Sequence, residues 1–272
     1  FNIKDRWGKI PNSIMRFKKA NSNLQRLCDV IHHDPELQWI KREGFDYGET
    51  NIPVYQMAAD HAEFLITYYT PENGKVLDSF MGRGTIGLAA LNHGRKFVGY
   101  DITKKFVDKT RAVMEEEFDT NDFELINNDS ILLEEFKDKS NYFDAVCFDP
   151  PYLKAEKYSD NKNDLSTMKD EEYILKIKEH FNQLYRLIKK SDFEQKKFYP
   201  VIVKVGTVRN GSKGIYDMDV EFQLAAREAG FRLWDKVYNE LYNIWGGMSF
   251  ERNYNNKYVQ KAHKNNLIFC KF

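Results

Sequence analysis

The chain alternates between short apolar runs and segments in which apolar residues recur at helical spacing. Short apolar runs bounded by turn residues predict buried strands, and they span 76–77, 97–100, 144–148 and 200–206. Apolar residues at three- and four-residue spacing predict amphipathic helices, and they cover 56–69, 106–118, 171–189 and 220–230. Strands and helices that alternate in this way predict an α/β fold built on a mostly parallel sheet.

The two ends of the chain differ from this middle part. Residues 231–240 and 266–272 are typical of closing strands and predict an antiparallel pair at the sheet edge. Residues 1–50 mix apolar and basic side chains with little regularity, although 23–33 is compatible with a helix. We therefore predict an N-terminal extension over 1–50, packed on or beside a core domain of 51–272.

The first chemical signal is the turn that follows the first predicted strand. It reads Phe-Met-Gly-Arg-Gly over 80–84 and leads into a helix of small residues from Thr85. Gly82 and Gly84 lack a Cβ atom, so the backbone can adopt unusual dihedral angles and approach a ligand closely. Asp101 ends the second strand, where a carboxylate can accept hydrogen bonds from both hydroxyls of a ribose. This half-unit predicts a site for an adenosine-containing cofactor, without choosing between NAD, FAD and S-adenosylmethionine.

The second signal is the tetrapeptide Asp149-Pro150-Pro151-Tyr152, which follows the strand predicted at 144–148. Consecutive prolines fix φ and carry no N–H group, so this strand tip is rigid and its carbonyl groups are free to accept hydrogen bonds. The Asp149 carboxylate and the Pro150 carbonyl together form a two-point acceptor for an NH2 group. Tyr152 offers an aromatic face on which a planar group can stack.

The two motifs together resemble the DNA amino-methyltransferases, which methylate adenine N6 or cytosine N4 with S-adenosylmethionine. The resemblance implies the class I methyltransferase fold, a Rossmann-like doubly wound, mostly parallel sheet with an antiparallel edge hairpin. It implies that S-adenosylmethionine is the cofactor and that the catalytic residues are Asp149, Pro150, Pro151 and Tyr152. The cofactor-binding residues that it implies are Asp78, Phe80, Gly82, Gly84, Thr85, Asp101, Ile102, Asp129 and Ser130.

Asp129 has two readings. It ends a third short strand that begins at Phe123, and the resemblance implies that it accepts a hydrogen bond from the cofactor adenine. The alternative is that it caps a helix starting at Ile131, and both roles can hold at once. In many relatives the Asp-Pro-Pro-Tyr motif precedes the cofactor turn. Here it follows the turn, so the chain resembles a circularly permuted relative without a large target-recognition domain.

Basic and aromatic residues interleave over 242–265, a combination that suits phosphate contacts and base stacking. We expect this segment to form a small nucleic-acid-contacting lid, with an ordinary surface loop as the alternative. Residues 201–272 carry eleven Lys or Arg against seven Asp or Glu. The candidate nucleic-acid contacts are Arg209, Arg252, Tyr254 and Lys257.

Composition narrows the choice of partners. The 272 residues contain 41 Lys or Arg and 41 Asp or Glu, so any affinity for DNA must come from local patches. Three cysteines without metal-ligand spacing suit a reducing cytoplasm and predict no metal site. No stretch of about 18 apolar residues is present, so no membrane span is expected.

The favoured hypothesis is a site-specific DNA methyltransferase that acts on the amino group of a flipped base. Adenine N6 is preferred over cytosine N4, because the family more often carries Asp with adenine and Ser with cytosine at the position of Asp149. One alternative is an RNA methyltransferase acting on guanine N2, where a similar motif also follows the cofactor turn. The other is a non-catalytic subunit with a cofactor fold that binds nucleic acid for a partner.

Overall fold

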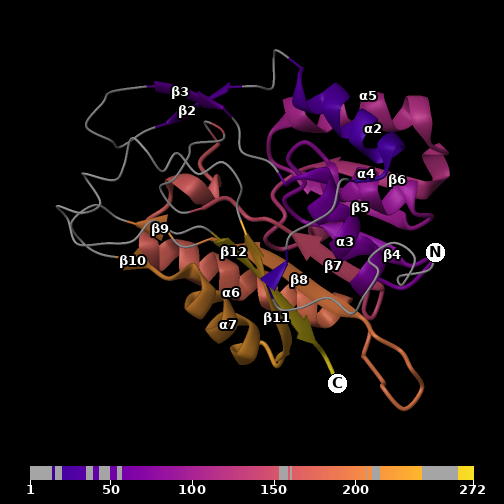
Figure 1. Cartoon of the computed structure of the whole chain (residues 1–272). Coiled ribbons are helices and arrows are strands. Elements are labelled where there is room, and N and C mark those ends of the chain that lie inside the picture. Colours follow the sequence, from indigo (N-terminus) through magenta and orange to yellow (C-terminus); the bar gives the residue numbers. More distant parts are fainter. Residues whose placement is uncertain are drawn as a thin grey trace.

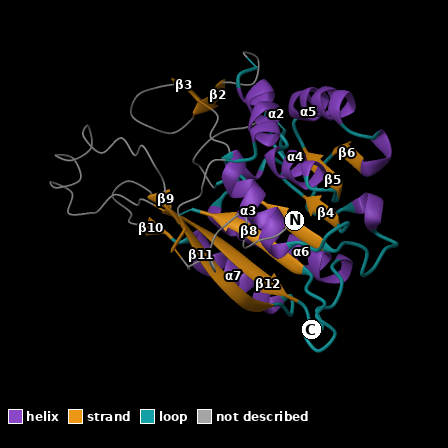
Figure 2. Ribbon diagram, turned by 45° about the vertical axis from the view of Figure 1, so that its right-hand side comes forward, coloured by secondary structure: helices purple, strands orange, loops and turns teal. Residues whose placement is uncertain are grey.

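The computed structural model describes most of the chain. The described residues are 14–15, 20–34, 39–42, 50–53, 57–152, 159, 161–206, 208–209, 215–240 and 263–272. They form an α/β structure around one large sheet (Figures 1 and 2). Among the helices of these segments, none combines the length and apolarity that a bilayer crossing requires.

The large sheet has eight strands in the order β1-β11-β12-β8-β7-β4-β5-β6. The five strands from β4 to β8 run parallel, while β12 pairs antiparallel with both β8 and β11. The predicted fold class, a mostly parallel sheet with an antiparallel edge, is confirmed. The strand bounds are β1 Ile14–Met15, β4 Lys75–Asp78, β5 Lys96–Asp101, β6 Phe123–Asn127, β7 Ala145–Phe148, β8 Pro200–Val205, β11 Arg232–Glu240 and β12 His263–Cys270.

Helices cover both faces of this sheet (Figure 1). One buried cluster unites α2, α3, α4 and α5 with one face, and a second unites α6 and α7 with the other. The helix bounds are α2 Ser22–His32, α3 Ala59–Tyr69, α4 Thr85–Asn92, α5 Lys104–Glu117, α6 Asp170–Leu187 and α7 Met218–Glu228. Short 3-10 turns cover Thr120–Asp122, Glu134–Phe136 and Leu165–Thr167, and two small hairpins pair β2 Trp39–Arg42 with β3 Thr50–Pro53 and β9 Val208–Arg209 with β10 Ile215–Tyr216.

The described part of the predicted N-terminal extension packs on the core. Leu24, Leu27 and Ile31 of α2 are buried in the same cluster as α3 and α4. The division of domains at residue 50 remains a prediction. At the other end, β12 begins at His263, so the last three residues of the predicted lid 242–265 belong to the sheet.

The strand order places a switch point between β4 and β7. From β4 the chain crosses through α4 to β5, whereas from β7 it crosses through α6 to β8 on the opposite face. Neighbouring parallel strands whose connections leave in opposite directions open a crevice at their carboxyl ends, and ligands bind there in open α/β sheets. Asp78 ends β4 and Asp149 follows β7, so both acids lie at this edge.

The turn between β4 and α4 depends on two glycines with positive φ. Gly82 has φ 50° and Gly84 has φ 71°, and Gly84 is the residue that precedes α4. A Cβ atom on Gly84 would lie 2.4 Å from Thr110 Cγ2, whereas a Cβ atom on Gly82 would meet nothing within 4 Å. The first glycine therefore leaves open space beside the turn, and the second lets the turn pack against α5.

This difference predicts that the two glycines tolerate alanine unequally. Gly84→Ala adds a steric clash to an unfavourable backbone conformation, and should lower the free energy of unfolding by about 2–4 kcal/mol. Gly82→Ala carries the backbone cost alone, about 1 kcal/mol. Urea unfolding of both variants measures the difference. Equal losses of stability would contradict the packing described for this turn.

Candidate active site

Asp101 is held at the tip of β5 by two backbone groups. Its Oδ2 accepts a hydrogen bond from the Gly82 N–H at 2.8 Å, and its Oδ1 accepts one from the Thr103 N–H at 2.7 Å. Burial raises the pKa of Asp101 to about 6, although these two hydrogen bonds oppose the rise. Each carboxylate oxygen has a second lone pair, so the side chain is oriented and can still accept from a ligand. Ile102, which follows it, is half-buried.

Asp78, by contrast, is turned into the protein. Its side chain is 1% exposed, and its Oδ1 accepts a hydrogen bond from the Phe80 N–H at 3.0 Å. Burial raises the pKa of Asp78 well above the ordinary value for a carboxyl group, and the nearby charges of Asp101 and Asp149 add to the rise. This carboxyl braces the cofactor turn from within, and its predicted contact with a cofactor remains a prediction.

The residues after β6 form the next part of the same edge. Asp129 Oδ1 accepts a hydrogen bond from the Ile131 N–H at 3.0 Å, and its Oδ2 accepts one from the Asn163 side chain at 3.0 Å. Asp129 therefore caps a turn, and no α-helix begins at Ile131, so the predicted helix cap is wrong in that respect. Ser130 is buried.

Phe80 and Thr85 complete the predicted cofactor residues. Phe80 is half-buried, and its ring centroid lies 5.7 Å from that of Phe148 and 5.3 Å from that of His180. Thr85 is buried at the start of α4, and its hydroxyl lies 3.1 Å from His32 Nε2. The end of α2 thus contacts the cofactor turn directly.

The carboxylate of Asp149 has a partner on each oxygen. Lys204 on β8 places its ammonium 2.5 Å from Oδ2, and the Tyr152 hydroxyl donates to Oδ1 at 3.1 Å. Burial tends to raise the pKa of Asp149, but the charges of Lys204 and Lys264 and these two hydrogen bonds outweigh it and hold the pKa below its ordinary value. Asp149 is therefore an anion over the whole neutral range.

The proline carbonyls at this tip differ from one another. The Pro151 carbonyl accepts a hydrogen bond from the buried Tyr173 hydroxyl at 3.0 Å. Pro150 is buried, and no donor among the described residues reaches its carbonyl oxygen. The Tyr152 ring lies between Gly206 and Lys264, whose ammonium is 4.7 Å from the ring centroid. The acceptor pair predicted from the sequence, Asp149 with Pro150, thus has the Pro150 oxygen free on the described side.

Two functional candidates escaped the sequence analysis. Lys204 was hidden in a strand that reads as plain core, although a lysine inside a buried strand is itself a signal that it has a charged partner. His180 belongs to the apolar stripe of α6, yet its Nε2 accepts from the Ser79 hydroxyl at 2.9 Å and its Nδ1–H points to the Ile131 carbonyl at 3.3 Å. Burial lowers the pKa of His180 to about 4, so the neutral ring ties the cofactor turn to the loop after β6.

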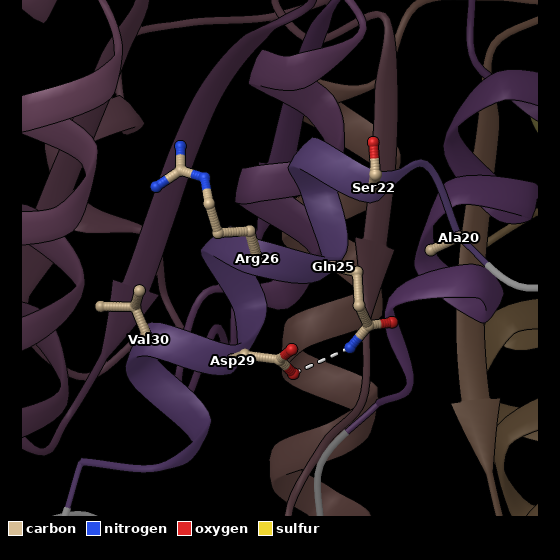
Figure 3. Close-up of a pocket in the computed structure, with 6 residues that line it drawn as sticks. All are labelled: Ala20, Ser22, Gln25, Arg26, Asp29 and Val30. Carbon is tan, nitrogen blue, oxygen red and sulfur yellow. Dashed lines mark hydrogen bonds between the residues drawn. The ribbon is translucent and has the colours of Figure 1, made fainter.

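The predicted nucleic-acid contacts are less well placed. Arg209 belongs to β9, in the small hairpin after β8. Arg252, Tyr254 and Lys257 lie outside the described residues. An open hollow along α2 is lined by Ala20, Ser22, Gln25, Arg26, Asp29 and Val30, and it contains none of the candidate residues (Figure 3). The described segments hold no group of three or more acidic, His or Cys side chains gathered as for a metal ion.

The residues at the ends of β4, β5 and β6 fit an adenosine-containing cofactor. Gly82 leaves open space beside the turn, and the Asp101 carboxylate stands at the neighbouring strand tip with lone pairs to spare. Asp129 and Ser130 follow the next strand outward. These groups would hold the nucleoside, and the Asp149 tip lies on the other side of β4 from them.

Comparison with known proteins agrees with this arrangement. A family model described as DNA methylase matches residues 18–112, which include the cofactor turn and end before Asp149. A type II methyltransferase of Streptococcus pneumoniae is 39% identical over 59 residues, 22% of each chain. A ribosomal RNA large subunit methyltransferase of Aliivibrio fischeri (strain ATCC 700601 / ES114) is 35% identical over 98 residues, 35% of this chain and 24% of that protein. The matched segments thus span about a quarter of these relatives.

A solved S-adenosylmethionine-dependent methyltransferase from Methanosarcina mazei has the same fold. Its TM-score is 0.50 at 13% identity, over 76% of this chain and 97% of that one. At this identity the likeness shows the fold alone, and the family assignment depends on the family model, the partial relatives and the motifs. S-adenosylmethionine is the cofactor of this family. Together these observations show that the chain belongs to the DNA amino-methyltransferase family.

Proposed function

We propose that this protein transfers a methyl group from S-adenosylmethionine to the exocyclic amino group of a nucleic-acid base, with adenine N6 of DNA as the favoured target. One observation carries the proposal. The acceptor tip after β7 and the cofactor turn after β4 follow two strands that pair directly, Val76 opposite Ala145 and Leu77 opposite Val146. Groups that must exchange a methyl therefore leave the sheet side by side at the switch point.

The chemistry explains why this tip suits an amino group. The lone pair of an exocyclic amino nitrogen is delocalised into the base, which makes the nitrogen a poor nucleophile. Two acceptors that bind its N–H groups pull it toward tetrahedral geometry and aim the lone pair. Asp149 and the Pro150 carbonyl supply such a pair, and each carboxylate oxygen can accept one hydrogen bond beyond those it already receives.

The transfer itself balances simply. S-adenosylmethionine supplies a methyl group on a positively charged sulfur that keeps the bonding electrons when the methyl leaves. The amino nitrogen forms the new bond with its lone pair and then loses one proton. Asp149, held as an anion by Lys204, can accept that proton through its hydrogen bond or pass it to water. Positioning of this kind supplies much of an enzyme's rate enhancement.

The target base must leave its helix to reach this edge, because its amino group is inaccessible inside a duplex. Tyr152 is the aromatic candidate for stacking. One face of its ring is close to the Lys264 ammonium, so a base that stacks on that face would take the place of this cation. The removal of Lys264 from the ring would also free a positive charge for a phosphate.

RNA is the second candidate substrate, and the ribosomal RNA methyltransferase relative favours it. Both substrates present an exocyclic amino group, so the acceptor pair serves either. Incubation of the protein with isotopically labelled S-adenosylmethionine and a mixture of DNA and RNA, followed by nucleoside mass spectrometry, separates them. We expect labelled N6-methyladenine from DNA. Label found only in RNA guanine would favour the second candidate, and label in neither polymer would contradict the proposal.

Cofactor binding should depend on pH through Asp101. The carboxyl has a pKa of about 6, so below this value it is protonated and loses acceptor capacity for the ribose hydroxyls. We expect the dissociation constant of S-adenosylmethionine to rise by up to about tenfold per pH unit below pH 6 and to be flat above pH 7. Calorimetry at several pH values measures it. Asp101→Asn should bind weakly with little pH dependence, and an equal wild-type affinity from pH 5 to 8 would exclude this role.

Removal of the acceptor carboxylate should abolish transfer without abolishing cofactor binding. We expect Asp149→Ala to lower the rate at least about a hundredfold, because the amino group loses its aim. The affinity for S-adenosylmethionine should change little, since the nucleoside lies on the other side of β4. Thermal unfolding must accompany the assay, because this change leaves the buried Lys204 unpaired. A folded variant with full activity would refute the assignment.

A further inference from the structure

We propose that Lys204 is a positioning residue, which orients the Asp149 carboxylate and keeps it an acceptor for the target amino group. This inference rests on the proposed function, because Asp149 acts there on the amino group. Lys204 itself contacts neither base nor cofactor in the proposal. It acts through Asp149, with which its ammonium forms an ion pair at 2.5 Å.

The position of Lys204 in the sheet is unusual for a charged residue. It lies in β8 between Val203 and Val205, two residues that are fully buried, and its own side chain is 4% exposed. A buried ammonium loses its hydration and repays that cost only through a well-placed partner. An apolar residue at such a site is often neutral or stabilising. Stability alone therefore does not explain a lysine here, and its partner Asp149 does.

The side of Lys204 away from Asp149 offers neutral groups. Asn266 on β12 is its direct opposite in the sheet register. The Asn266 carbonyl oxygen accepts from His61 Nε2 at 3.0 Å, and the Asn239 amide reaches His61 Nδ1 at 3.1 Å. Burial, with the charge of Lys204, lowers the pKa of His61 to about 3, so this ring is neutral. Among the described residues, Asp149 is the one carboxylate paired with Lys204.

Three carboxyl groups at one sheet edge show what the lysine does. Burial acts on all of them in the same direction. It raises the pKa of Asp78 well above the ordinary value and that of Asp101 to about 6. Asp149, beside Lys204, has a lowered pKa instead. A protonated Asp149 would present an O–H donor where the target amino group needs an acceptor, so the ion pair sets the chemical character of the site.

Other titratable groups surround Asp149 and define what a test must separate. Lys264 on β12 acts in the same direction as Lys204 but is half-buried, and the Tyr152 hydroxyl donates to the carboxylate. The remaining groups that interact electrostatically with Asp149 from neighbouring elements are Asp78 on β4, His61 on α3, Cys147 on β7 and Tyr173 on α6. Burial raises the pKa of the Cys147 thiol and the Tyr173 hydroxyl, so both are neutral near pH 7.

The chain contains a matched control at the other end of β7. Lys189 forms an ion pair with Asp144 at 2.6 Å, just before the strand begins. Lys204→Met and Lys189→Met each remove one ammonium and keep an unbranched apolar side chain. We expect Lys204→Met to raise the pKa of Asp149 by about 1–3 units, and to move the acid limb of the methylation rate profile by the same amount. Lys189→Met should change neither, and Lys204→Arg should keep the pKa low because it keeps the charge.

The Asp149 carboxyl can be followed directly by carbon-13 NMR of protein labelled at aspartate, with the signal assigned by its loss in Asp149→Asn. In the wild-type protein we expect it to titrate below the ordinary aspartate value of about 3.9. A wild-type pKa at or above that value overturns the proposal without any lysine variant, and so does a shift in Lys204→Met no larger than in Lys189→Met. If the shift occurs but the wild-type protein methylates neither DNA nor RNA, the proposed function fails, and the catalytic role of Lys204 fails with it.

Discussion

Two neighbouring strands, β4 and β7, end at the same edge of the sheet while their connections pass to opposite faces. The site depends on this split. It leaves the ends of β4, β5 and β6 available to one ligand and the end of β7 to another, with a single strand spacing between them. A methyl donor and a methyl acceptor require such closeness, and the general rule for open α/β sheets places ligands there.

Charge then differentiates positions that the fold makes similar. Asp78, Asp101 and Asp149 all stand at this edge, yet one is buried against the turn, one is held by two backbone N–H groups and one pairs with a lysine. The environment of each carboxyl therefore decides whether it braces the backbone, accepts from a ribose or accepts from an amino group. His180 adds a neutral link between the walls of the cofactor site.

Local features of the chain were predictable from the sequence, and contacts between distant segments were not. The strands, the helices and the two motifs follow from residue patterns and steric properties of Gly and Pro, with errors at ends such as α3, which begins at Ala59 rather than residue 56. The Lys204–Asp149 pair joins residues 55 positions apart, and it exists because the register of β7 and β8 brings them together. The His180 contacts similarly depend on how α6 crosses the sheet, which no local pattern specifies.

The central claim is that cofactor and acceptor meet at the β4–β7 switch point. A crystal structure with S-adenosylhomocysteine bound tests this most directly, because the product keeps the ribose and the sulfur. The account predicts the ribose at Asp101 and the sulfur facing the Asp149 carboxylate across the turn at Gly82. A product bound elsewhere, or a sulfur separated from Asp149 by packed side chains, would contradict it.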